Sequence, residues 1–164
     1  MILKKVKNVL FYFFMIFLIF LILIFLISTY QIQIRKKEYS TILGYSLFII
    51  SSGSMEPTLD VGDDVIIKKT SNINKGDIIV YKDDVLNMLV CHRVVEVKNN
   101  KIKCQGDNNN SVDRDINSSQ VIGKVIMVIP KIGYIQTYIR KPKIIVFLVG
   151  ILILLLTISN LDFS

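Results

Sequence analysis

A serine-rich turn, one histidine and several aspartates provide the side chains that nucleophilic catalysis requires. Ser54 lies in the segment 51–57, with the sequence SSGSMEP, directly after the apolar run Leu47–Ile50. A serine hydroxyl is a weak nucleophile until a neighbouring base takes its proton, and His92 is the chain's only histidine. An aspartate that accepts from the imidazole would fix its tautomer and stabilise its protonated form. These residue types predict a Ser-His-Asp relay, which could hydrolyse an amide without a metal or other cofactor.

A predicted β-hairpin decides which carboxylate approaches the histidine. Residues 90–97 and 101–105 are strand-like, and the pair Asn99-Asn100 between them favours a tight turn. A turn centred on that pair sets charge opposite charge and apolar opposite apolar, which supports the register. The expected opposite pairs are Glu96 with Lys103, Val97 with Ile102, Val95 with Cys104, and His92 with Asp107. Asp113 and Asp115 follow on the chain, so three aspartates are candidate partners of the histidine.

The two cysteines have no predicted role in chemistry. Cys91 and Cys104 are several pairs apart in this register, so we expect no disulfide between them. Two thiols and one histidine without a repeated spacing predict no metal site.

The rest of the middle of the chain alternates short β-branched runs with turn residues. Gly-Asp pairs lead into the runs 65–67 and 78–81, and 121–129 is a further apolar stretch. Strands at this spacing predict a compact, mostly antiparallel β domain. Two apolar residues near the serine, Met55 and Leu59, have three open roles: ordinary core, the lining of shallow pockets, or contact with lipid.

The charge distribution separates the middle of the chain from its ends. The segment Gly44–Ile139 contains 11 basic and 11 acidic residues, so the net charge of +7 comes from the two ends. Basic residues beside apolar runs are typical of membrane flanks and not of a nucleic-acid-binding surface. We therefore expect contact with membrane lipid and no nucleic-acid partner.

Both ends carry an apolar run that predicts a membrane-spanning helix. Val9–Ile27 has 19 residues, or about 28 Å of helix, which is close to the hydrocarbon thickness. A cleavable signal peptide is the alternative, but this run is long for one and is followed by no small-x-small cleavage site. Ile144–Ile158 is almost free of polar residues, which favours a second span over a buried helix of a soluble protein. The expected organisation is a tail and transmembrane helix over 1–34, a β catalytic domain over 35–142, and a transmembrane helix and tail over 143–164.

Five short motifs in this order resemble the successive conserved boxes of signal peptidase I. They are Ser52–Thr58, Gly62-Asp63, Gly76–Tyr81, His92–Val95 and Gly106–Asn109. Bacterial-type members of that family carry a lysine base just before an arginine. In this chain the same position is His92, followed by Arg93, which resembles the endoplasmic-reticulum-type branch that includes the SipW-like enzymes.

The resemblance implies a role for each matching residue. Ser54 corresponds to the family nucleophile, His92 to its general base, and Asp113 to the catalytic aspartate of the endoplasmic-reticulum-type enzymes. Asp107 corresponds to a second important aspartate, and Ser52 to the position whose hydroxyl completes the oxyanion hole in bacterial relatives.

The leading hypothesis is a membrane-bound serine endopeptidase that removes signal peptides from secretory precursors after a small-x-small motif. It would be a two-span protein of the cell membrane with its catalytic domain outside the cytoplasm. The alternative is a non-catalytic, membrane-tethered β domain that binds or scaffolds exported proteins. A self-cleaving repressor is disfavoured because such proteins are soluble. No accessory subunit can be named from these residues.

Overall fold

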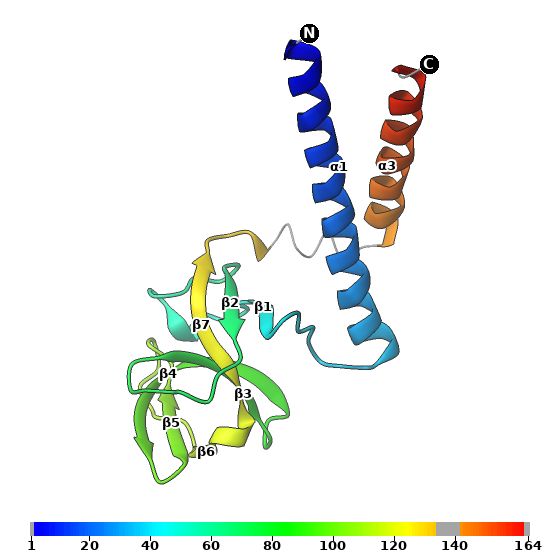
Figure 1. Ribbon diagram of the computed structural model, residues 1–164. Coiled ribbons are helices and arrows are strands. Elements are labelled where there is room, and N and C mark those ends of the chain that lie inside the picture. The colour runs from blue at the N-terminus through cyan, green and yellow to red at the C-terminus, as the bar shows by residue number, and fades with distance from the viewer. Residues whose placement is uncertain (1, 134–141, 163–164) are drawn as a thin grey trace. The chain divides into compact units, whose positions relative to one another are not determined.

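The computed structural model describes residues 2–133 and 142–162, which divide into two compact units (Figure 1). One unit comes from the middle of the chain and begins at Leu43, and the other takes its residues from both ends. The first contains the predicted β domain and the second the predicted membrane segments. Part of the basic cluster before the second apolar run, Arg140 and Lys141, lies outside the described residues.

The described residues of the unit formed by the chain ends contain two α-helices. Helix α1 (Ile2–Thr29) continues into a π-helical turn, η1 (Tyr30–Ile34), and its stretch Asn8–Ile34 is long and apolar enough to cross a membrane. Helix α3 (Pro142–Asp162) contains a shorter apolar stretch, Val146–Thr157. Of the described helices, only α1 therefore meets the length expected for a span, and the predicted second span stays a prediction.

The middle unit is one seven-stranded sheet in which all neighbouring strands are antiparallel. The spatial order is β1-β2-β7-β3-β4-β5-β6. The strands are β1 (Tyr45–Ile49), β2 (Asp64–Lys68), β3 (Ile78–Asp83), β4 (Met88–Lys98), β5 (Lys101–Gln105), β6 (Ile116–Asn117) and β7 (Val121–Ile129). The antiparallel β domain predicted from the sequence is confirmed, and every predicted run lies in or overlaps a strand. Only β6 was missed, because two residues are too few to show a period.

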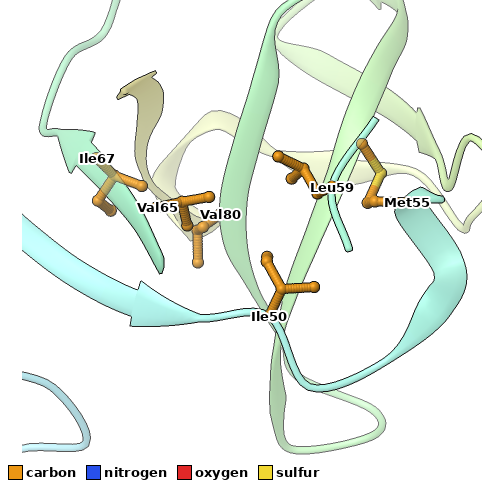
Figure 2. Close-up of a cluster of buried hydrophobic side chains, with 6 residues drawn as sticks. All are labelled: Ile50, Met55, Leu59, Val65, Ile67 and Val80. Atoms are coloured by element: carbon orange, nitrogen blue, oxygen red, sulfur yellow. The ribbon is translucent and has the colours of Figure 1, made fainter. Parts of the chain in front are cut away.

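Two hydrophobic clusters lie on opposite faces of the sheet around β3. Side chains alternate between the faces of a strand, so Val80 joins one cluster while Ile79 and Tyr81 join the other. The first cluster, shown in Figure 2, consists of Ile50, Met55, Leu59, Val65, Ile67 and Val80. The second, called the Tyr81 cluster below, consists of Ile79, Tyr81, Val94, Ile102, Cys104 and Ile116. Of the three roles left open for Met55 and Leu59, ordinary core is the one they have, since both are almost fully buried.

The predicted hairpin is formed by β4 and β5. Asn99 and Asn100 both have positive φ, 49° and 64°, as a type I′ turn requires. The predicted pairs next to the turn, Glu96–Lys103 and Val97–Ile102, are confirmed, and Glu96 and Lys103 form a salt bridge of 3.0 Å.

Beyond those pairs the predicted register is wrong by one residue. A bulge between Val94 and Glu96 leaves Val95 unpaired, so Cys104 faces Val94. Because a bulge inserts one extra residue into one strand, every earlier residue of β4 shifts against β5. His92 is therefore not opposite Asp107 as predicted, and on the other side of β4 it faces Ile79 of β3.

Candidate active site

The candidate nucleophile lies in a one-turn 3₁₀ helix, η2 (Gly53–Met55), which follows β1 after three residues. The Ile50 N–H donates to the Asp63 carbonyl at 2.8 Å, and the Gly62 N–H donates to the Ile50 carbonyl at 2.9 Å. Met55, next to the serine, is only 1% exposed. The backbone hydrogen bonds of Ile50 before Ser54 and the packing of Met55 after it thus hold the serine in place. Ser54 itself is half-buried.

The structure brings Ser54 and Asp113 to opposite nitrogens of His92. The imidazole Nδ1 lies 2.6 Å from Asp113 Oδ2, and Nε2 lies 3.1 Å from Ser54 Oγ. When Nδ1 carries its proton and donates it to the carboxylate, Nε2 is free to accept from the serine hydroxyl. His92 is 7% exposed, so its ring lies largely out of water, while Ser54 is half-buried.

Two hydrogen bonds that could not be predicted from the sequence hold Asp113. Its backbone N–H donates to the carbonyl of Cys104 on β5, at 2.8 Å. Its side-chain Oδ2 accepts from the Tyr81 hydroxyl on β3, at 2.9 Å. Tyr81 is the site residue that sequence reasoning missed. No local pattern marks it, because it is the pairing of Ile79 with His92 across the sheet that brings Tyr81, two residues further along β3, to the site.

Asp107, the aspartate predicted opposite the histidine, pairs with Arg93 in the structure. Its two carboxylate oxygens accept from Nε and an Nη of the guanidinium at 2.8 and 2.7 Å. Arg93 faces Gln105, two residues before Asp107, so the bulge makes the two charges diagonal neighbours. The hydrogen bonds from Arg93 lower the pKa of Asp107, and those to Asp107 raise the pKa of Arg93.

The third candidate aspartate lies at the other end of the hairpin. Asp115 lines a shallow cavity near the Asn99-Asn100 turn, together with Lys101 and Lys103. Of the three aspartates, Asp113 is therefore the one whose carboxylate touches the imidazole.

The segment after β5 closes against the serine turn. Asn108 donates from its backbone N–H to the Ser54 carbonyl at 2.9 Å, and from its side chain to the Gly53 carbonyl at 3.1 Å. A Cβ at Gly106 would lie 2.5 Å from the Ser54 carbonyl oxygen, so only glycine fits there. The Gly106–Asn109 motif thus positions the turn that carries Ser54. The residue types of the motif alone did not predict this role.

Ser52, the predicted oxyanion-hole residue, lies beside the nucleophile. Its Oγ is 3.3 Å from Ser54 Oγ, and its side chain is exposed. A hydroxyl in this position and the backbone N–H of Ser54 could both donate to an oxygen bound above the serine.

The cysteines are free thiols in the sheet. Burial raises the pKa of both Cys91 and Cys104 to about 12, so they stay protonated at neutral pH and are poor nucleophiles. Within residues 2–133 and 142–162, no cluster of histidine, cysteine and carboxylate side chains has the arrangement of a metal site.

Comparison with known proteins places the chain in a peptidase family. A family model described as Peptidase S24-like matches residues 26–126. The signal peptidase complex catalytic subunit SEC11 of Eremothecium gossypii is 30% identical over 124 residues, which cover 66% of this chain and 74% of that protein. The subunit of the same name from Saccharomyces cerevisiae strain YJM789 is 30% identical over 112 residues, or 59% of this chain and 67% of that protein.

Proposed function

Because this chain belongs to the Peptidase S24-like family, in its endoplasmic-reticulum-type signal peptidase branch, we propose that it is a membrane-bound serine endopeptidase that removes signal peptides from secretory precursors. The observation that carries the proposal is the unbroken hydrogen-bonded series from Ser54 through His92 to Asp113. The cut would follow a small-x-small motif, as the resemblance implies.

The proposed acylation step uses His92 as general base. Its Nε2 takes the proton of the Ser54 hydroxyl while the oxygen attacks the carbonyl carbon of the precursor's scissile bond. The Ser54 N–H and the Ser52 hydroxyl would donate to the oxyanion that forms. Asp113 accepts from Nδ1 throughout, which stabilises the imidazolium created by the transfer.

The remaining steps return the site to its starting state. The imidazolium donates its new proton to the leaving amine, the C–N bond breaks, and the mature protein departs. Water, deprotonated by the same Nε2, then attacks the ester carbonyl on Ser54. The imidazolium returns that proton to the Ser54 oxygen as the ester C–O bond breaks, which releases the signal peptide and restores both residues. Apart from water and the substrate itself, the groups that take up or give up protons in this sequence are Ser54 and His92.

The proposed setting is the cell membrane. Helix α1 would anchor the chain, the segment 35–142 would lie outside the cytoplasm, and 143–164 would return as a second span. An anchor keeps the enzyme near precursors that are themselves threaded through the membrane, which raises their effective concentration.

Substitution of the nucleophile tests the proposal. We expect the full-length Ser54→Ala variant, in detergent or vesicles, to lose precursor cleavage by at least a hundredfold, because no other activated hydroxyl is left. The matched control is Ser51→Ala, three residues away and exposed, which should cleave at the wild-type rate.

Two outcomes would count against the assignment. Unchanged cleavage by Ser54→Ala would exclude that hydroxyl as nucleophile. A wild-type chain that binds an exported protein yet is not labelled by a serine-directed acylating probe would favour the non-catalytic tethered domain.

A further inference from the structure

The Tyr81 hydroxyl contacts the aspartate of the proposed relay. Its hydroxyl lies 2.9 Å from Asp113 Oδ2, the same oxygen that is 2.6 Å from His92 Nδ1. The tyrosine is 1% exposed, so its ring belongs to the core and only its hydroxyl reaches the site. One carboxylate oxygen thus receives two hydrogen bonds, one from the base and one from the sheet.

The register of β3 and β4 explains this placement. Tyr81 faces Val90, and Ile79 faces His92, so Tyr81 and His92 are diagonal neighbours on one face. The ring packs in the Tyr81 cluster with Ile102 and Cys104 of the hairpin's return strand. Asp113 lies above that cluster because its backbone bonds to Cys104.

The phenol acts as a donor and not as an acid or base of the reaction. Burial, followed by the hydrogen bond to Asp113, raises the pKa of Tyr81 far above its ordinary value. It therefore keeps its proton wherever the enzyme would work. A neutral donor this close to a carboxylate stabilises the ionised form of that carboxylate.

We propose that Tyr81 is a positioning residue of the relay, which selects the Asp113 oxygen that holds His92 and weakens that oxygen's pull on the imidazole proton. The inference rests on the proposed function, because it assigns a role in the same site. The hydrogen bond from the Tyr81 hydroxyl goes to Asp113, so its effect on His92 passes through that carboxylate.

The groups around Asp113 determine the effect of removing the Tyr81 hydroxyl. Asp113 is approached by the Tyr81 hydroxyl, the His92 ring and the thiol of Cys104, and the thiol stays protonated. Two further carboxylates interact electrostatically with these residues: Asp83 with Tyr81, and Asp107 with His92. The salt bridge to Arg93 balances the charge of Asp107. Loss of the phenol hydroxyl alone should therefore leave the Asp113 carboxylate a stronger acceptor of the hydrogen bond from His92 Nδ1.

The test is Tyr81→Phe in the full chain, assayed for precursor cleavage across pH. We expect kcat to fall about tenfold, the loss typical of one hydrogen bond to a charged group, with KM within about twofold. The acid limb of kcat/KM should move to higher pH. The control is Ile102→Val, which loosens the same cluster without touching Asp113 and should leave the limb in place.

A second variant keeps the inference testable if Tyr81→Phe does not fold. Site-specific 3-fluorotyrosine at position 81 preserves the ring and makes the phenol a stronger donor, so the acid limb should move to lower pH.

The outcomes separate this inference from the proposed function. Wild-type kcat and an unmoved limb in Tyr81→Phe and in the fluorotyrosine protein, with Ser54→Ala inactive, would overturn the role of Tyr81 alone. Active Ser54→Ala would overturn the proposed function. Limb shifts of opposite sign in the two Tyr81 proteins would establish the positioning role, since loss of packing cannot produce them.

Discussion

At the scale of single residues, the site depends on the two nitrogens of one imidazole. His92 meets Asp113 through Nδ1 and Ser54 through Nε2, so in the proposed reaction the ring would be held on one side while it exchanges protons on the other. A lysine has a single nitrogen and cannot divide these tasks. The geometry therefore favours histidine at a position where bacterial-type relatives in this family carry lysine.

We expect His92→Lys to lose at least a hundredfold in kcat/KM for precursor cleavage. The nearby Asp113 carboxylate would keep the new ammonium charged, whereas a lysine base needs a desolvated pocket without such a partner. His92→Gln, similar in size but unable to act as base, is the matched comparison and should be equally inactive. Wild-type activity in the lysine variant would show that the site is not built for imidazole.

At the scale of elements, the Arg93–Asp107 pair joins β4 to the segment that closes over the nucleophile turn. Arg93 also donates to the Gly76 carbonyl, at 3.0 Å, so its guanidinium bridges two loops. Because the pKa of Asp107 is lowered in the folded chain, the pair stabilises the fold above the ordinary carboxyl range, and that stabilisation is lost as the pH falls through the lowered value.

Removing this pair should therefore cost stability at neutral pH and nothing in strong acid. We expect Asp107→Asn to unfold about 1 kcal/mol more easily than the wild type at pH 6, with the difference closing below about pH 4. Urea unfolding of the full chain in detergent, followed at both pH values, measures it.

The matched comparison is Glu96→Gln, which breaks the exposed ion pair with Lys103. Exposed pairs contribute little, so this change should leave the unfolding midpoint nearly the same at both pH values. A difference for Asp107→Asn that stayed constant down to pH 3 would contradict the role of its charge.

Much of the fold could be predicted from local patterns, and the site only in part. The β-branched runs and the Asn99-Asn100 turn specify strands and a hairpin through neighbouring residues alone. The bulge at Val95 has no such signal, since the uninterrupted register pairs charges and apolar residues equally well at the turn. The choice of Asp113 depends on the path of the chain after β5, and the role of Tyr81 on a strand pairing across the sheet.

At the scale of the whole molecule, the proposed topology places both chain ends in the cytoplasm. Protease added to intact cells should digest the segment 35–142, because it would lie outside, and a reporter fused at the C-terminus should stay protected. Digestion only after lysis would refute the outward orientation. A digested reporter would show that α3, with its short apolar stretch, does not return through the membrane.

The unpaired residue at Val95 has a consequence for reading inactive variants. If β4 paired with β5 without the bulge, Arg93 would replace His92 on the face of the sheet that carries Ile102. A guanidinium cannot take a proton from serine. A shift of the strand by one residue would leave the amount of β-structure unchanged, but it would put the permanently charged Arg93 where the proton-accepting His92 should be. Inactivity with an undisturbed circular dichroism spectrum therefore does not by itself identify a missing catalytic side chain, because a hairpin shifted by one residue would give the same result.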